Sequence, residues 1–247
     1  MAFLLELADR IFEVDNIYPE AEYFCRDYIA DNAEDAIKIK ITEDDILLEK
    51  KFSENEDVRA GTALRDFPPQ YLEILALYRK IAEILIDYDT VLFHGSCICV
   101  ENRGYLFTAK SGTGKSTHTR LWRELLGNSA VMINDDKPLL KITDNSVVAY
   151  GTPWNGKHKL STNRAVVLKS VCLLNRGKEN CIEKIDNCEK KEYYPQIFSQ
   201  IYRSRNPERL KKTFILADTL IKNVDLFNLY CNMDISAAKL SYNAMKG

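Results

Sequence analysis

The spacing of apolar residues divides the chain into a sparse N-terminal part and a denser remainder. Residues 37–41 alternate apolar and basic positions, a polar turn follows at 42–45, and residues 46–48 are apolar, which together read as strand material. Pro68 and Pro69 then open an apolar pattern of helical period over residues 70–88. We therefore expect residues 1–88 to form a small accessory α+β domain and residues 89–247 a second domain.

After residue 89, short apolar runs recur with turn residues between them. The patterns predict strands at 91–100, 105–108, 131–133, 139–142, 147–150, 166–174, 181–185 and 224–230, and helices at 115–126, 193–202, 207–222 and 235–245. Turns at 101–104, 144–145 and 175–177 predict hairpins, which argue against a purely parallel sheet. The predicted fold class is α/β (α+β), with a mixed, largely antiparallel sheet and a helical C-terminal third.

The strongest chemical signal is the run AKSGTGKS at residues 109–116. It matches the P-loop pattern Gly-x-x-x-x-Gly-Lys-Ser/Thr except that Ala109 takes the place of the first glycine. Gly112 and Gly114 give the backbone the freedom to wrap its N–H groups around phosphates, and the predicted helix points its positive end at the anion. The expected nucleotide-binding residues are Ser111, Gly112, Thr113, Gly114, Lys115, Ser116 and Thr117.

Roles within this run follow from side-chain chemistry. The ammonium of Lys115 suits the outer phosphates, and the hydroxyl of Ser116 suits a magnesium ion. The sequence therefore predicts ATP and Mg²⁺ as cofactors.

Two acidic residues, Asp135 and Asp136, end the predicted strand at 131–133. An acid at this place holds Mg²⁺, directly or through water, in many P-loop proteins. Neighbouring side chains on extended backbone point to opposite sides, so one carboxylate can face the metal and the other an acceptor hydroxyl. His94 lies on the strand that pairs with the one leading into the loop, which would bring it towards the phosphates.

A third group of candidates follows residue 151. Residues 152–158 form a Thr-Pro-Trp-Asn-Gly-Lys-His loop in which Lys157 and His158 could present a cation to phosphate or to an acidic substrate. Arg164 is a weaker candidate of the same kind. The alternative for this segment is a surface loop with a packed tryptophan.

Composition narrows the expected partners and location. The net charge of −2 gives no electrostatic reason to expect nucleic acid or a membrane surface as partner. No apolar run approaches the roughly 20 residues of a membrane span. The seven cysteines lack metal-site or disulfide spacing, which suits reduced thiols in the cytoplasm. We expect a cytoplasmic protein, with its oligomeric state left open.

The ordered set of His94-Gly95, residues 109–116 and Asp135-Asp136 resembles the catalytic core of HPr kinase/phosphorylase and its compact relatives. That core is also related to ATP-dependent phosphoenolpyruvate carboxykinase, and the resemblance covers residues 90–165 best. It implies a kinase in which Asp135, helped by His94, orients or deprotonates the acceptor hydroxyl while Asp136 binds metal. The glycine-rich segment with a metal-binding glutamate found in true HPr kinases is absent here.

The resulting hypothesis is an ATP- and Mg²⁺-dependent kinase acting on a hydroxyl acceptor, either the serine of a peptide or protein or a small molecule. Two alternatives stay open. A carboxykinase-like lyase would need further arginines for a dicarboxylic acid. A regulatory module would bind ATP without transferring phosphate.

Overall fold

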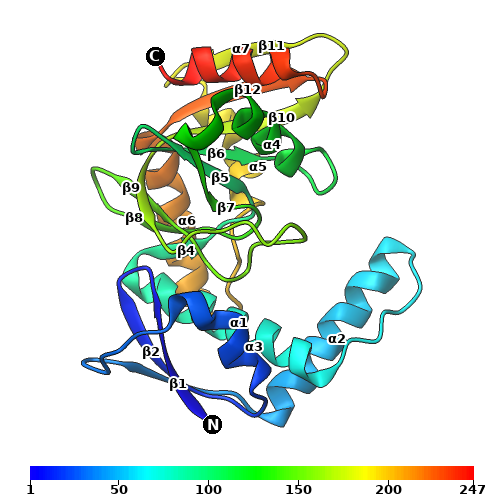
Figure 1. Cartoon of the computed structure of the whole chain (residues 1–247), viewed down its shortest axis with the longest axis vertical. Helices are drawn as coiled ribbons and strands as arrows, with labels where there is room; N and C mark the ends of the chain where they lie inside the picture. The colour runs from blue at the N-terminus through cyan, green and yellow to red at the C-terminus, as the bar shows by residue number, and fades with distance from the viewer. The chain divides into compact units, whose positions relative to one another are not determined.

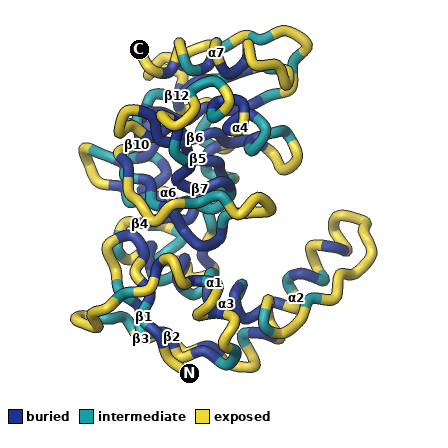
Figure 2. The backbone as a smooth tube through the Cα atoms, viewed as in Figure 1, coloured by how far each residue is buried: buried dark blue, intermediate teal, exposed yellow.

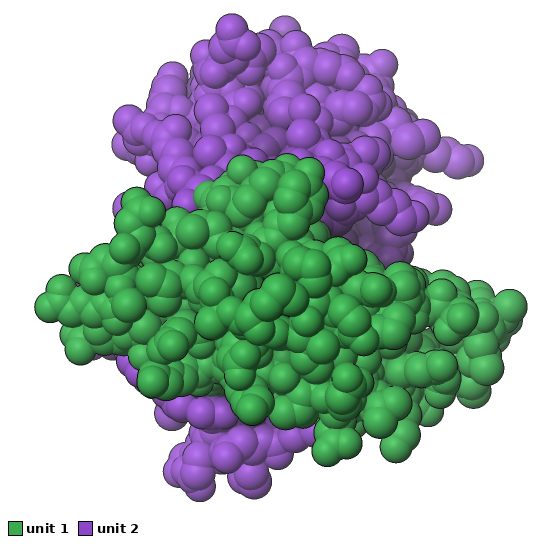
Figure 3. Space-filling model, turned by 60° about the horizontal axis from the view of Figure 1, so that its bottom comes forward, with its two compact units in different colours: residues 1–84 green, residues 85–247 purple.

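A computed structural model describes all residues, 1–247. The chain divides into two compact units, Met1–Ile84 and Leu85–Gly247, coloured separately in Figure 3. The division falls between Ile84 and Leu85, whereas the sequence pattern placed it after residue 88. No helix is long and apolar enough to cross a membrane.

Unit 1 combines a three-stranded sheet with three helices (Figure 1). Its strands are β1 (Ala2–Leu7), β2 (Arg10–Asp15) and β3 (Ile37–Lys40), and its helices are α1 (Glu20–Cys25), α2 (Glu43–Ala60) and α3 (Pro69–Leu85), with a 3-10 turn at Arg26–Tyr28. β1 and β2 pair antiparallel and β3 lies parallel to β2. Alternate residues of β1 and β2 are buried, which forms one apolar face on the sheet.

The expected strand character of residues 46–48 is wrong, because these residues belong to α2. Thr42 caps this helix: its hydroxyl accepts from the N–H of Asp45 at 3.4 Å, and its own N–H donates to the Asp45 carboxylate at 2.8 Å. Such a capping box satisfies two donors at the helix start and so fixes where the helix begins. The polar segment at residues 42–45, which the sequence pattern predicted to be a turn, is this helix cap.

Buried carboxylates of unit 1 find their partners within the unit. Glu73 on α3 is fully buried and accepts from the N–H groups of Ile17 at 2.5 Å and Tyr18 at 3.0 Å. Glu49 and Asp57 on α2 are each buried against an arginine. Arg79 donates twice to Glu49, and Arg65 donates to Asp57 through both its backbone and its guanidinium.

Unit 2 is built on a nine-stranded sheet. Its strands are β4 (Thr90–Leu92), β5 (Ser96–Val100), β6 (Arg103–Thr108), β7 (Ala130–Asn134), β8 (Leu139–Ile142), β9 (Val147–Tyr150), β10 (Ala165–Arg176), β11 (Cys181–Ile185) and β12 (Asp225–Cys231). The main order is β4-β8-β9-β10-β6-β5-β7, and β12 pairs with both β10 and β11. Six of the eight strand pairs are antiparallel, so the expected mixed, largely antiparallel sheet is confirmed.

Helices cover both faces of this sheet (Figure 1). They are α4 (Lys115–Leu126), α5 (Tyr194–Phe198), α6 (Pro207–Asn223) and α7 (Ile235–Met245), with 3-10 turns at Ile86–Tyr88, Gly127–Ser129 and Lys190–Tyr193. Neighbouring residues of one strand enter opposite cores: Val171 of β10 packs with residues of α6, and Cys172 with Trp122 of α4. Figure 2 shows this buried interior beneath an exposed surface of turns and helix backs.

Two expected strand arrangements are wrong. The predicted strand at 91–100 breaks at residues 93–95, whose N–H groups bond instead to the carbonyls of Pro138, Gln200 and Asp136. The predicted hairpin of 166–174 with 181–185 does not form, because β12 lies between these strands, parallel to β10 and antiparallel to β11. The C-terminal third contains the three strands predicted there, β10, β11 and β12, together with α5, α6 and α7, so the term helical describes it only in part.

Candidate active site

The glycine-rich loop, residues 109–114, connects the end of β6 to the start of α4. Gly112 has φ +76° and Gly114 φ +125°, conformations that residues with a side chain adopt rarely. Helix α4 begins without a side-chain cap, and the first of its N–H groups to find a backbone acceptor is that of His118, on the Gly114 carbonyl at 2.9 Å. The preceding N–H groups are open to an anion, and the helix dipole adds positive potential there.

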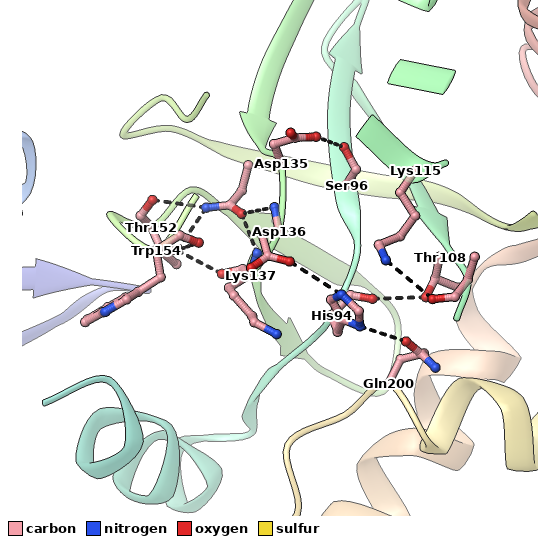
Figure 4. Close-up of polar contacts among 12 residues, drawn as sticks. His94, Ser96, Thr108, Lys115, Asp135, Asp136, Lys137, Thr152, Trp154 and Gln200 are labelled. Atoms are coloured by element: carbon pink, nitrogen blue, oxygen red, sulfur yellow. Dashed lines mark hydrogen bonds and ion pairs between the residues drawn. The ribbon is translucent and has the colours of Figure 1, made fainter. Parts of the chain in front are cut away.

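Lys115 is the first residue of α4 and is only 8% exposed. Its ammonium reaches the Ala109 carbonyl at 3.4 Å (Figure 4). Burial lowers the pKa of Lys115, and nearby Lys137 lowers it further, while Asp136 and Asp135 oppose the shift. A cation in this position is desolvated, and a polyanion beside it would restore the lost stabilisation.

Asn134, the last residue of β7, fixes the backbone of the two aspartates. Its fully buried side-chain carbonyl accepts from the N–H groups of Asp136 at 2.8 Å and Lys137 at 2.6 Å. Its amide donates to the carbonyl and hydroxyl of Thr152 at 3.0 and 2.9 Å. This Asx turn ends the strand and turns successive carboxylates to different surroundings.

Asp135 lies towards α4. It is 4% exposed, and one of its oxygens accepts from the Ser96 hydroxyl at 2.6 Å and from Thr119 at 3.5 Å. The two hydroxyls are themselves 3.0 Å apart. Asp135 is thus held on the floor of the site by β5 and α4 together.

Asp136 lies on the other side, against His94. The distance from His94 Nε2 to Asp136 Oδ1 is 3.4 Å, and His94 Nδ1 is 3.1 Å from Gln200 Oε1 (Figure 4). Burial, with the charges of Lys137 and Lys115, lowers the pKa of His94 to about 4. The imidazole is therefore neutral at pH 7, with one ring nitrogen facing the Gln200 amide and the other facing the Asp136 carboxylate.

The carboxylate neighbour of His94 is thus Asp136, whereas Asp135 is held by Ser96 and Thr119. The backbone fixes this pairing, because the N–H of Gly95 donates to the Asp136 carbonyl at 3.0 Å. A Cβ at residue 95 would lie 2.8 Å from the end of the Leu106 side chain and 3.1 Å from the Phe107 carbonyl, so a larger residue would require β6 and Leu106 to shift.

The loop at residues 151–161 forms a further wall of the cleft in which these side chains lie. Gly156 has φ +73°, and a Cβ on it would meet the Cβ of Asp136 at 3.1 Å. Lys157 and His158 follow at the rim. The resulting main cleft has a volume of about 540 Å³. It is lined by His94, Ser111, Gly112, Gly114, Lys115, Ser116, Thr117, Asp135, Asp136, Gly156, Lys157 and His158.

Nearly all of the sequence-predicted site residues thus meet in one cleft. Two do not line it: Thr113 faces two neighbouring clefts, and the Arg164 guanidinium donates to the Asn102 side chain at 2.7 Å. The third histidine, His118, is buried in the core, where its Nε2 lies 2.9 Å from the Ser241 hydroxyl.

Sequence reasoning missed four residues that shape the site: Ser96, Thr119, Gln200 and Arg176. Arg176, at the end of β10, donates to the Gly112 carbonyl at 2.5 Å. Ser96 could have been found as the polar residue that follows His94-Gly95 at the start of an otherwise apolar strand. Gln200 and Arg176 come from distant segments, and no local pattern marks them.

No protein-family model and no curated protein sequence matches the chain. A solved structure, the HPr(Ser) kinase/phosphatase from Coxiella burnetii, is similar over 63% of this chain and 99% of its own, at 9% sequence identity and a TM-score of 0.33. An overlap this loose does not show membership of a family, so the function has to be argued from the site itself.

Proposed function

We propose that unit 2 is an ATP- and Mg²⁺-dependent kinase that transfers the γ-phosphoryl group to a hydroxyl acceptor. The observation that carries this proposal is the convergence, in one cleft, of an uncapped helix start, a buried lysine and two carboxylates with different surroundings. In-line phosphoryl transfer needs positioning and charge neutralisation more than covalent chemistry, and these groups supply both.

The phosphates are assigned to the glycine-rich loop and the start of α4. The N–H groups there would bind the β- and γ-phosphate oxygens, and Lys115 would neutralise the charge that develops during transfer. Lys157 and His158 at the rim are placed to meet the transferring group or an anionic part of the acceptor.

The donor set fits magnesium in the presence of a nucleotide. Within unit 2, no group of three His, Cys, Asp or Glu side chains could hold a metal by itself. Mg²⁺ in phosphate sites commonly takes one or two protein oxygens and completes its shell with water and phosphate. Ser116 and Asp136 supply such oxygens, and when bound the ion would neutralise phosphate charge. His94 Nε2 faces the same carboxylate, so we assign His94 to this metal and phosphate side.

Asp135 is then the group for the acceptor hydroxyl. Hydrogen bonds from Ser96 and Thr119 hold one of its oxygens, which orients the carboxylate at the cleft floor. A carboxylate so fixed can accept the hydrogen of an incoming hydroxyl and direct its oxygen towards phosphorus.

The test is incubation of the full chain with Mg²⁺ and γ-labelled ATP against a panel of serine peptides and small hydroxyl metabolites, read by mass spectrometry. Label on an acceptor, absent in the Asp135→Asn variant, supports the proposal. Label found only as inorganic phosphate across the panel would favour the regulatory module. Nucleotide consumption that depends on oxaloacetate would indicate the carboxykinase-like lyase.

A further inference from the structure

A second cleft opens on the far side of the glycine-rich loop, between α4 and the ends of β10 and β12. This α4–β12 cleft has a volume of about 480 Å³, within the range of small-molecule sites. It shares Gly112, Gly114 and Thr117 with the main cleft, so the two are continuous over the loop. Its remaining lining is Thr113, His118, Leu121, Leu174, Asn175, Arg176, Gly177, Cys231, Asn232 and Met233.

We infer that the α4–β12 cleft holds the nucleoside of the triphosphate, with Met233 folding over the base; this inference rests on the proposed function. Thr117 and Leu121 are four residues apart and share one face of α4. A triphosphate whose outer phosphates sit at the start of α4 can therefore continue along this face, past Thr117, into the cleft.

The walls of the cleft suit a flat, partly apolar ligand. Leu121 and Leu174 are buried and form its apolar floor. Met233, on the turn between β12 and α7, lines the cleft and is 78% exposed. An unbranched thioether adapts to the shape of a ring, and covering a base would remove Met233 from water.

His118 supplies an acceptor in this wall that lacks a partner. Ser241 receives the Trp122 N–H at 2.8 Å and donates its own hydrogen to the Ala238 carbonyl at 3.1 Å, so His118 Nε2 must donate to Ser241. His118 Nδ1 is left as a lone pair, buried and without a hydrogen-bond partner. Among the residues lining the cleft, His118 alone has such an atom. The atom is closed to solvent in the unliganded protein, so a ribose hydroxyl or a base amino group would reach it once this wall moves on binding.

Asn175 offers a second acceptor. Its amide donates to Asn228 at 2.7 Å, which orients its carbonyl oxygen away from that partner. Arg176 beside it donates to the Gly112 carbonyl. The cleft therefore presents two acceptors and a cation next to apolar surface, which matches a ribose, an amino-bearing base and the adjoining phosphate.

A third cleft of about 340 Å³ adjoins the α4–β12 cleft, with which it shares Thr113, Leu174, Asn175 and Arg176, and it is the competing place for the base. We call it the α5 cleft. Gln196, Ser199 and Gln200 make its wall polar, and no residue of α4 lines it. A path along the α4 face does not reach it.

The test compares the affinities of ATP and inorganic tripolyphosphate, each with Mg²⁺, by calorimetry. Met233→Ala should weaken ATP about fivefold, the loss expected when part of a methionine no longer covers the ligand, and leave tripolyphosphate unchanged. Cys231→Phe, which fills the cleft, should weaken ATP about tenfold or more with the same selectivity. Ile215→Ala is the matched control, because Ile215 is 59% exposed on α6 and lines none of these clefts.

Three results would overturn the inference. If the wild type binds tripolyphosphate as tightly as ATP, no nucleoside site exists, although the phosphate site stands. If Gln196→Ala weakens ATP while Met233→Ala and Cys231→Phe do not, the base occupies the α5 cleft. If the wild type binds neither compound, the proposed function fails along with this inference.

Discussion

The two units differ in how their buried charged side chains are stabilised. In unit 1, Glu73, Glu49 and Asp57 are buried, and each is matched by N–H groups or by an arginine of the same unit. In unit 2, Lys115 and Asp135 are equally buried but line an open cleft, and the Lys115 ammonium reaches only a carbonyl oxygen at 3.4 Å.

This difference separates charge that builds the fold from charge that awaits a ligand. Taking an ion out of water is costly, and close partners offset that cost in unit 1. The main cleft leaves part of that cost uncompensated at Lys115, whose ammonium has the Ala109 carbonyl at 3.4 Å as its hydrogen-bond partner. Sites with such perturbed groups in a cleft are candidates for chemistry, whereas fully paired groups are usually structural.

The largest effect is expected from removing the charges of the main cleft. Asp135→Asn should reduce phosphoryl transfer by about a thousandfold and keep ATP affinity, and Lys115→Ala should reduce both. Neither should lower the free energy of unfolding substantially, because neither leaves a buried countercharge alone.

Lys190 provides the matched control for Lys115. It is also a buried lysine of unit 2, but it donates to the Val224 carbonyl at 2.7 Å, away from the cleft. Lys190→Met should leave ATP affinity unchanged by calorimetry. Equal losses of ATP affinity in the Lys115 and Lys190 variants would contradict the comparison.

In unit 1, substitution of a buried carboxylate should lower the stability of the fold and leave ligand binding unchanged. Glu73→Ala removes the acceptor of two buried N–H groups and should lower the free energy of unfolding by about 3 kcal/mol, measured by urea denaturation. ATP affinity of the folded protein should not change. A Glu73→Ala protein of wild-type stability would show that this buried carboxylate is not structural.

The pH dependence of stability should report the two buried histidines, His94 and His118. Burial lowers the pKa of each from 6.5 to about 4, so the unfolded chain binds more protons between these values and stability falls as pH drops through this window. The loss between pH 7 and pH 4 should be about 3 kcal/mol for each residue. Urea denaturation across this range measures it, and His118→Gln should remove about half of this slope while His158→Gln should leave it unchanged.

The smallest effect is expected at a residue that only positions the proposed base. Ser96→Ala removes the 2.6 Å hydrogen bond to Asp135 and should lower kcat about tenfold with little change in KM for ATP. Steady-state kinetics distinguish this outcome from a general folding defect, in which the fraction of active protein falls. A raised KM for ATP with normal kcat would place Ser96 on the nucleotide side instead.

Features that depend on local interactions could be predicted from the sequence, whereas features that depend on contacts between distant segments could not. The helices at 115–126 and 235–245 and the hairpin of β8 with β9 follow local patterns and turn residues, and all were predicted with their observed bounds. The grouping of residues 111–112, 114–117, 135 and 136 in one cleft was also predicted, because strand ends and helix starts meet at one sheet edge.

Contacts set by distant segments were not predictable. β12 lies between β10 and β11 in the sheet, although it begins 40 residues after the end of β11 in the sequence. Nothing in the Asn175–Gly177 turn indicates this insertion. The pairing of His94 with Asp136 likewise depends on the break in the strand at residues 93–95, where backbone groups bond to loops far away in sequence.

The glycine after His94 has an evolutionary consequence. A side chain at position 95 would crowd Leu106 and the β6 backbone whatever the protein acts on, whereas position 94 matters only if the cleft is used. In a related protein, the residue at position 95 therefore reports on the fold, and the residue at position 94 reports on the activity. A homologue that keeps the glycine and loses the histidine is expected to retain the architecture as a pseudoenzyme, and one that retains both is the better candidate for an active catalyst.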